Sequence, residues 1–326
     1  MSDEKRVATD AENSLVLRLD HLVKHFKTNA GEVKAVDDVS LSLMRGETLA
    51  LVGESGCGKS TLGRMAVSLI RPTSGSVFLE GQDITSLKKR EIRPLRRKMQ
   101  MVFQDPFSSL DPQMTLAEII AEPLRAQGER DTREKVLDLM ERVGLQRELA
   151  DRYPHQLSGG QRQRVGIARA LAPEPEVIVC DEPVSALDVS IQAQILNLLR
   201  KLQRETHIAF LFISHDLAVV RYISQRVCVM FLGQLCEVCP TDDAYERPLH
   251  PYTQLLINAA PEPDPELAGR EKTLLQGEIP SPINPPKGCR FCTRCPFATE
   301  ECRTVRPEMK DYGNGRFCAC HHPLGA

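Results

Sequence analysis

The sequence lacks three features that would each place it in a broad class. It has no apolar run approaching the roughly 18 residues that a membrane-spanning helix needs. Its start, MSDEKRVATDAENS, has no apolar stretch of the kind found in secretory signals. Neither sign of charge dominates, because 42 Lys and Arg stand against 44 Asp and Glu, for a net charge of −2. We therefore expect a cytosolic protein without a broad cationic surface for nucleic acid.

What is present is the composition of an ordinary folded protein. Of the 326 residues, 41% are hydrophobic and 26% are charged, which is close to globular usage. A chain of this length has room for two domains and a small third one. The composition changes beyond about residue 240, where prolines cluster at 261–265 and 280–286 before a cysteine-rich tail.

Short apolar runs indicate a mainly parallel α/β sheet. A buried strand is predicted at 48–53, a half-buried strand at 36–46, and further strands at 15–26, 76–81, 176–181, 208–214 and 226–233. Helical patterns alternate with the strands, which favours parallel pairing. Residues 115–175 are almost wholly helical in pattern and are predicted to be an insertion into the sheet.

Residues 53–61 read GESGCGKST, which fits the pattern G-x-x-x-x-G-K-[ST] between a strand and a helix. This context predicts a nucleotide phosphate loop, called the P-loop below. Backbone N–H groups of Gly56, Gly58 and Lys59 are expected to bind phosphates. Lys59 would add a charge for the outer phosphates, and Ser60 a hydroxyl for Mg²⁺. The alternative is a glycine turn with a surface lysine, and the flanking strand and helix count against it.

The sequence VIVCDE at 177–182 is an apolar strand that ends in two acids. An acid at a buried strand end is costly unless it meets a cation. Asp181 beside Mg²⁺ would satisfy that condition, and Glu182 would then be placed to polarise an attacking water. Ordinary strand-end polarity is the alternative.

LSGGQRQRVGIARAL at 157–171 places Ser158 and two glycines before an amphipathic helix. The start of this helix is bare of side chains and suited to an anion. A simple N-cap followed by a turn is the alternative.

Together these motifs resemble those of the ABC-transporter ATPases. LSGGQ matches the signature sequence of that family. Gln104 matches the Q-loop glutamine, SALD at 185–188 the D-loop, and His215 the switch histidine. Phe26 stands where the family often has a tyrosine that stacks on adenine, and phenylalanine can also stack. The motifs cover residues 20–235.

Further segments are similar to the F-type ATP-binding subunits of oligopeptide and dipeptide permeases. They are QDPFSSLDP at 104–112, DEPVSALDVSIQAQ at 181–194, HPYT at 250–253 and SPINPPKGC at 281–289. This resemblance runs nearly from end to end of the chain.

The resemblance implies a P-loop NTPase fold of the ABC type. It has a RecA-like, mainly parallel sheet, an antiparallel β part and an inserted helical subdomain at about 101–175. A small cysteine-rich C-terminal domain follows. The implied division is a flexible tail over 1–14, an ATPase domain over 15–240 and a C-terminal extension over 241–326.

The resemblance also implies the site residues. Hydrolysis is assigned to Glu182 with His215 and Gln104, and Mg²⁺ is assigned to Ser60, Gln104 and Asp181. The residues expected to bind ATP within the chain are Phe26, Gly53, Glu54, Ser55, Gly56, Cys57, Gly58, Lys59, Ser60 and Thr61. The residues expected to contact ATP held by a second subunit are Ser158, Gly159, Gly160, Gln161 and Asp188.

The implied activity is ATP hydrolysis that powers peptide import, with ATP and Mg²⁺ as cofactors. The implied partners are a D-type paralogue forming a heterodimer, two transmembrane permease subunits and an extracytoplasmic binding protein, with no nucleic acid. The implied location is peripheral, at the cytoplasmic face of the bacterial inner membrane. This branch also includes importers of nickel, glutathione and sugars, so the cargo stays open.

Six of the 11 cysteines lie in the last 38 residues. They begin as C-x2-C-x2-C and continue with two looser steps. In a cytosolic protein such a cluster favours a metal centre over disulfides. Four thiolates can bind zinc or an iron–sulfur cluster, and spacing alone does not choose among the sets of four. The C-x2-C at Cys236 and Cys239 lies on a predicted strand and is expected to be structural.

The permease resemblance implies a particular ligand set, Cys289, Cys295, Cys302 and Cys320, and a [4Fe–4S] cluster, with zinc as the alternative. Cys292 and Cys318 would be extra thiols. Such a centre would have a sufficient role in stabilising the fold of a small proline-rich tail, without any redox activity.

Two other functions fit this sequence less well than a transport motor. A soluble ABC ATPase acting on DNA or ribosomes usually carries two cassettes or a long coiled coil, and this chain has neither. An iron–sulfur redox protein would need a flavin or dinucleotide fingerprint, which is missing.

Overall fold

The computed structural model describes residues 14–105, 107–259 and 278–325. The predicted flexible tail therefore lies outside the described residues except for Ser14, and so does the proline cluster at 261–265. No helix in the described part of the chain is long and apolar enough to cross a membrane.

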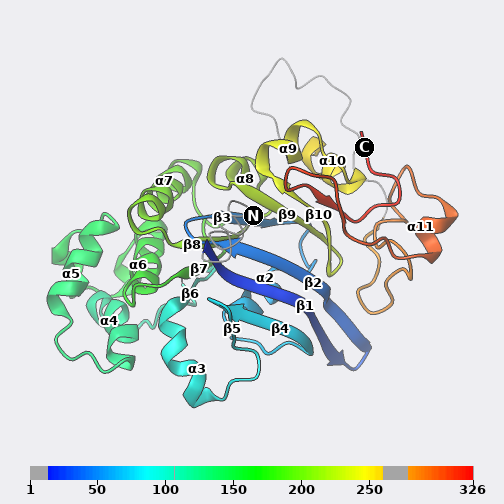
Figure 1. Ribbon diagram of the computed structural model, residues 1–326. Coiled ribbons are helices and arrows are strands. Elements are labelled where there is room, and N and C mark those ends of the chain that lie inside the picture. The colour runs from blue at the N-terminus through cyan, green and yellow to red at the C-terminus, as the bar shows by residue number, and fades with distance from the viewer. Residues whose placement is uncertain (1–13, 106, 260–277, 326) are drawn as a thin grey trace, which may run out of the picture.

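The main sheet has eight strands in the order β11-β12-β10-β9-β3-β8-β7-β6 (Figure 1). Neighbours from β9 to β6 pair in parallel, whereas β10, β12 and β11 continue the sheet by antiparallel pairs. Every residue of β3, β7 and β8 is buried, as their apolar sequences predict. The strands are β3 (Thr48–Val52), β6 (Met99–Val102), β7 (Val177–Asp181), β8 (Ala209–Ile213), β9 (Arg226–Phe231), β10 (Gln234–Pro240), β11 (Lys310–Asp311) and β12 (Phe317–Cys318).

A second, antiparallel sheet has the order β2-β1-β4-β5. Its strands are β1 (Leu15–Thr28), β2 (Gly31–Met44), β4 (Ser74–Leu79) and β5 (Gln82–Asp83). Helix α2 (Lys59–Ala66) lies between the two sheets, because Leu62 and Met65 pack in one core with Leu17 of β1 and Val179 of β7. Because α2 follows the P-loop directly, contacts with both sheets hold the loop in place.

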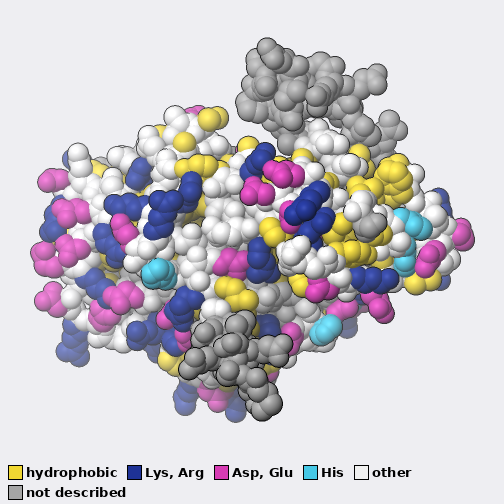
Figure 2. Space-filling model, turned by 45° about the horizontal axis from the view of Figure 1, so that its top comes forward, with side chains coloured by type: hydrophobic (Ala, Val, Ile, Leu, Met, Phe, Trp, Pro, Cys, Tyr) yellow, Lys and Arg dark blue, Asp and Glu magenta, His cyan; other side chains and the backbone are white. Residues whose placement is uncertain are grey.

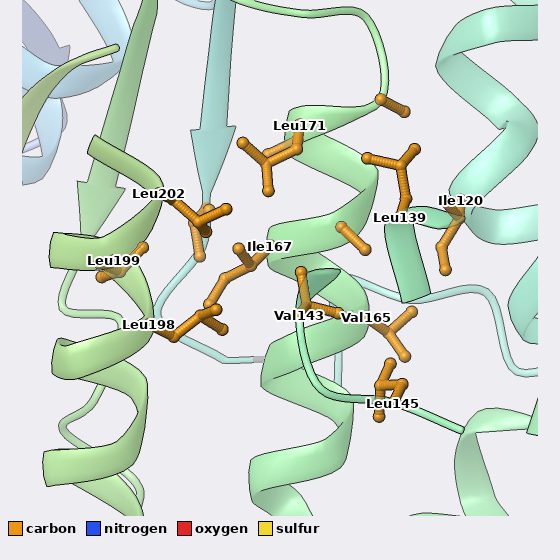
Figure 3. Close-up of a cluster of buried hydrophobic side chains, with 14 of the residues drawn as sticks. Ile120, Leu139, Val143, Leu145, Val165, Ile167, Leu171, Leu198, Leu199 and Leu202 are labelled. Carbon is orange, nitrogen blue, oxygen red and sulfur yellow. The ribbon is translucent and has the colours of Figure 1, made fainter. Parts of the chain in front are cut away.

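Three helices lie between β6 and β7, although these strands are neighbours in the sheet: α4 (Leu116–Ala126), α5 (Arg133–Arg142) and α6 (Gly159–Leu171). Two short 3₁₀ turns, Arg147–Leu149 and Pro154–Gln156, lie between α5 and α6. Figure 3 shows Ile167 of α6 beside Leu198 of α7 (Val189–Thr206), and Val165 on the other side of α6, beside Leu145. Helix α6 therefore joins the inserted helices to the main sheet through a shared apolar core. Helix α3 (Lys89–Leu95) and the turn Arg96–Lys98 precede β6.

The remaining helices are α8 (Leu217–Ile223), α9 (Thr241–Glu246), α10 (Pro251–Asn258) and α11 (Glu300–Thr304). The C-terminal segment joins the main sheet, since Phe317 and Cys318 pair with Val238 and Glu237 of β10. Phe291 contacts the rings of Phe231 and Tyr252, with centroid distances of 5.4 and 5.1 Å. The cysteine-rich segment therefore extends the sheet that carries the P-loop and shares its core.

Candidate functional site

The P-loop follows β3 and passes close to two neighbouring strands. Gly53 and Gly58 have φ angles of 152° and 107°, where glycine is favoured. A Cβ at Gly53 would lie 2.0 Å from the carbonyl oxygen of Met230, and one at Gly58 would lie 2.0 Å from that of Ala35. The glycines of the motif are therefore required by both conformation and space. Ser55 and Gly56 are exposed at the tip of the loop, and Thr61 is half-buried in α2.

The Lys59 ammonium lies inside the loop and is 5% exposed. Its Nζ donates to the carbonyl oxygens of Gly53 at 2.7 Å and Glu54 at 2.9 Å. Cys57 lies beside it, with Sγ 3.8 Å from Nζ, and burial raises the pKa of its thiol. Cys57 is therefore a buried packing residue whose burial disfavours the reactive thiolate form.

Ser60 and Asp181, both predicted to hold Mg²⁺, meet directly. The Ser60 hydroxyl donates to Asp181 Oδ1 at 2.8 Å, and Asp181 is 2% exposed at the end of β7. Burial raises the pKa of Asp181, opposed by this hydrogen bond. A buried carboxylate beside a hydroxyl is the oxygen donor set that Mg²⁺ prefers, so these residues fit the ion.

The three predicted catalytic residues also come together. Gln104 Nε2 donates to Glu182 Oε2 at 2.8 Å, and His215 Nδ1 lies 3.1 Å from Glu182 Oε1. Gln104 follows β6, Glu182 follows β7 and His215 follows β8, so the carboxyl ends of three adjacent parallel strands supply them. Glu182 has a φ of 46°, a left-handed conformation that non-glycine residues rarely adopt. Gln104, also predicted at Mg²⁺, here contacts Glu182 instead.

The signature sequence begins α6 as a capping box. The Ser158 hydroxyl accepts from Gln161 N at 3.3 Å, and Gln161 Oε1 accepts from Ser158 N at 3.0 Å. Ser158 is exposed, whereas Gly160 is buried. A Cβ at Gly160 would lie 2.5 Å from Ile191 Cγ2, so glycine lets α6 approach α7 closely.

The remaining predicted contacts lie at the surface. Asp188 is the exposed N-cap residue of α7, and its side chain makes no capping hydrogen bond. Phe26 lies on β1 and is 36% exposed, with Lys24 Nζ 5.1 Å from its ring centroid. Its ring is thus accessible for stacking.

Two P-loop contacts were absent from the sequence prediction. The Tyr252 hydroxyl accepts from Glu54 N at 3.0 Å. Arg294 donates to both carboxylate oxygens of Glu54, at 2.7 and 3.0 Å. Tyr252 lies in the HPYT segment, whose sequence indicated only the permease resemblance. Arg294 lies inside the C-x2-C-x2-C run, where only the cysteines were expected to have a function. No local pattern links either residue to Glu54.

Five of the six tail cysteines line one small cavity beside His250. They are Cys289, Cys292, Cys295, Cys302 and Cys320. Cys318 is not among its lining residues and is buried on β12 against β10. In the described residues, no group of three or more His, Cys, Asp or Glu side chains is arranged to hold a metal ion. This finding covers Cys236 and Cys239, which are buried on β10.

Two family models match the chain. One, described as "ABC transporter", matches residues 36–185. The other, described as "Oligopeptide/dipeptide transporter, C-terminal region", matches residues 236–302. The first includes the P-loop, the signature and Glu182, and the second includes Tyr252 and Arg294.

Curated relatives match over nearly the whole length. The probable peptide ABC transporter ATP-binding protein y4tS of Sinorhizobium fredii is 54% identical, over 94% of this chain and 89% of its own. The oligopeptide transport ATP-binding protein AppF of Bacillus subtilis is 51% identical, over 96% of this chain and 99% of its own.

Solved structures of ATP-binding cassettes share the fold. The dimeric, post-hydrolysis structure of MJ0796 bound to ADP and Pi is 32% identical with a TM-score of 0.64, over 69% of this chain and 98% of that one. The cbiO1 protein of Clostridium perfringens is 28% identical with a TM-score of 0.63, over 72% of this chain and 92% of that one. The chain therefore belongs to the ATP-binding subunits of ABC transporters, in the oligopeptide and dipeptide branch.

Proposed function

We propose that this chain hydrolyses ATP to power the import of peptides through a membrane ABC transporter. The observation that carries the proposal is the arrangement of Glu182 between Gln104 and His215, next to the Ser60–Asp181 pair. Peptide is favoured as the cargo because both relatives described above are named for peptide or oligopeptide transport. The family model that matches residues 236–302 is also described as part of an oligopeptide and dipeptide transporter.

Each residue of the site has a distinct task in this reaction. Backbone N–H groups of the P-loop bind the phosphates, and Lys59 neutralises their charge. Ser60 and Asp181 hold Mg²⁺, which offsets charge that develops on the phosphate oxygens. The Glu182 carboxylate accepts a hydrogen bond from the attacking water and orients it toward the γ-phosphorus. His215 holds the carboxylate on one side and Gln104 on the other.

The second half of the site comes from a second ATPase subunit. Ser158 and Asp188 are exposed, and the hydrogen bonds of Ser158 and Gln161 given above stay within their own capping box. This leaves the start of α6 accessible to ATP on a facing chain, with Gly159, Gly160 and Gln161 contributing backbone there. ATP would then join two chains, and hydrolysis would release them.

The partner is proposed to be a D-type paralogue in a heterodimer. Two transmembrane permease subunits would bind the inserted helices, at about 101–175, on the cytoplasmic face of the inner membrane. An extracytoplasmic binding protein would deliver peptide. Nucleic acid is not a partner in this proposal, and Figure 2 shows Lys and Arg side chains interspersed with Asp and Glu over the face drawn. Residues 15–240 would form the ATPase domain and 241–326 the permease-type extension.

Co-purification tests this function. The chain is expressed with its candidate permease subunits and the partner ATPase, and the complex is isolated through a tag on one permease subunit. We expect this chain in the complex and ATP hydrolysis that rises on addition of peptide-loaded binding protein. Recovery of the permease subunits without this chain would contradict the assignment.

The tail is proposed to hold a [4Fe–4S] cluster through Cys289, Cys295, Cys302 and Cys320. Support comes from the donor set, since only cysteine and histidine side chains among the ligating types line the cavity. Burial raises the pKa of Cys289 to about 12 and that of Cys320 to about 11, so these thiols need a cation nearby to ionise. The described residues contain no group of three or more His, Cys, Asp or Glu side chains arranged to hold a metal ion, so the proposal rests on the types of donor and on the permease resemblance.

Metal analysis of anaerobically purified protein tests the cluster. We expect about four irons per chain with matching acid-labile sulfide. One zinc per chain would support the zinc alternative instead. Neither metal, with every tail thiol reactive to a thiol reagent after unfolding, would overturn the proposal.

A further inference from the structure

The cysteine-rich segment reaches the P-loop through a buried ion pair between Arg294 and Glu54. Arg294 lies between Cys292 and Cys295, and its side chain is 4% exposed. Its guanidinium donates from Nη1 to Glu54 Oε2 at 2.7 Å and from Nη2 to Oε1 at 3.0 Å. Such a two-bonded fork fixes both the position and the orientation of the carboxylate. The residues are 240 positions apart in sequence, so the contact exists only when the segment is in place.

A second contact holds the same residue by its backbone. Tyr252 of α10 is fully buried, and its hydroxyl accepts from Glu54 N at 3.0 Å. The Tyr252 ring packs on Phe231 at 4.8 Å and on Phe291 at 5.1 Å between centroids. Phe291 belongs to the same turn as Arg294, because Arg294 N donates to the carbonyl oxygen of Phe291 at 3.0 Å. Glu54 is therefore held at its side chain by Arg294 and at its backbone by Tyr252, and Phe291 contacts both of these residues.

The charge on Glu54 makes this support matter for ATP. Glu54 is the second residue of the P-loop, and its carbonyl oxygen also accepts from Lys59 Nζ. Its side chain is only 20% exposed, so solvent screens the carboxylate poorly. An unpaired carboxylate here would repel the phosphates of ATP and leave a buried charge without a partner. Arg294 removes both costs while it fixes the start of the loop.

We propose that Arg294 is a positioning residue of the ATP site, through which the cysteine-rich segment sets the affinity of the P-loop for ATP. This inference rests on the proposed function for its nucleotide. Arg294 acts through Glu54 and is not assigned a contact with ATP. The segment that carries the tail cysteines thereby gains a role in the nucleotide site itself.

The test compares Arg294→Gln with wild type in the complete transporter. Binding of a fluorescent ATP analogue gives Kd, and hydrolysis gives KM and kcat separately. We expect Kd and KM to rise on the order of tenfold, because the P-loop loses the charge-assisted fork that fixes Glu54 and its carboxylate is left unpaired. The turnover at saturating ATP should change less than twofold. Arg294→Lys keeps the charge but loses the two-bonded fork. Its Kd and KM should therefore lie between those of wild type and those of Arg294→Gln.

Arg306→Gln is the matched control. Arg306 lies in the same C-terminal segment and pairs with Asp38 of β2, at 3.2 Å, rather than with the P-loop. The Kd of the Arg306→Gln variant for the fluorescent ATP analogue should stay within twofold of the wild-type Kd. A tenfold loss in this variant would mean that any weakening of the segment lowers affinity, and would overturn the specific role of Arg294.

The double variant Glu54→Gln with Arg294→Gln separates charge neutralisation from general loss of structure. Removing both charges leaves no unpaired carboxylate, so most of the lost affinity should return. A double variant as weak as Arg294→Gln alone, or a single variant with wild-type Kd, would overturn the inference. These binding results do not depend on turnover, so a wild-type complex that binds ATP without hydrolysing it would contradict the proposed function and leave the test of Arg294 readable.

Discussion

The Glu182 carboxylate has a different polar partner at each of its oxygens. Gln104 contacts one and His215 the other, and the left-handed backbone at Glu182 directs the side chain toward both. Strain of this kind persists only where surrounding contacts fix it, and it clusters at functional sites. At the scale of single residues, this is the feature that most favours hydrolysis.

We predict that Glu182→Gln lowers hydrolysis about 100- to 10,000-fold, the range for losing a general base. ATP binding should persist, because glutamine keeps the shape and can still bond Gln104 and His215. Phosphate release from the assembled transporter, with the partner's ATP site silenced, measures the effect. Glu205→Gln is the control, because Glu205 is an exposed residue of α7 whose carboxylate lies 3.8 Å from Lys201 Nζ. Undiminished release by Glu182→Gln would refute its role.

Asp181 gives a pH-dependent prediction. Burial raises its pKa, so the folded state binds more protons than the unfolded state between the ordinary and the raised pKa values. Stability therefore falls as pH rises through that window. Asp181→Asn removes the buried charge, and asparagine can still accept from the Ser60 hydroxyl.

Without Mg²⁺, we expect Asp181→Asn to raise Tm at pH 7 relative to wild type, by an amount that shrinks as the pH is lowered. Addition of Mg²⁺ with ATP should raise Tm in wild type more than in the variant. Thermal melts at several pH values give both results. A variant less stable than wild type at pH 7 would show that the ionised carboxylate stabilises the fold.

At the scale of elements, Gly160 allows the start of α6 to lie close to α7. Gly160→Ala would place a Cβ 2.5 Å from Ile191 Cγ2 and push the helices apart. We predict a loss of roughly 1–3 kcal/mol in the free energy of unfolding, as for other overpacked contacts. Hydrolysis should fall as well, because the displaced residues begin the signature helix.

Gly166→Ala is the control for this change. Gly166 lies in the same helix, and a Cβ there has nothing within 4 Å. Alanine should be neutral or stabilising by roughly 0.5–1 kcal/mol, because glycine weakens helix interiors. Chemical denaturation of both variants decides the matter. Equal effects from the two substitutions would show that helix propensity, and not the contact with Ile191, controls stability.

The helices and strands also differ in how well the sequence predicts them. Apolar runs and helical periodicity predicted β3, β7, β8 and α6 well, because the pattern of apolar residues in each matches the residues that it buries. The pairing of Phe317 and Cys318 with β10 could not be predicted, since strands of two residues carry no period. Contacts such as Arg294 with Glu54 were hidden for a related reason. They join distant segments and leave no trace in local spacing.

At the scale of the whole molecule, the cassette and the C-terminal segment share a core. Phe291 is fully buried and meets Phe231 of β9 edge to face. We predict that Phe291→Ala costs roughly 3–5 kcal/mol, as for other buried aromatic truncations. Because the core is shared, the protein should still unfold in one transition at a lower temperature.

Phe297→Ala provides the matched control, since Phe297 lies in the same segment but is 49% exposed. It should leave Tm nearly unchanged. Calorimetry distinguishes the outcomes. If Phe291→Ala gave two transitions, with the larger one at the wild-type temperature, the segment would be an independent unit and the link from tail to P-loop would be weak.

The central claim is that this chain converts ATP hydrolysis into peptide import. The most direct test is uptake of labelled peptide by proteoliposomes that contain the complete transporter, with ATP supplied on the side of the ATPase subunits. The account predicts ATP-dependent uptake with wild type, and uptake that falls together with phosphate release in Glu182→Gln. Uptake that continues at the wild-type rate when this chain cannot hydrolyse ATP, or ATP hydrolysis that never responds to peptide, would contradict it.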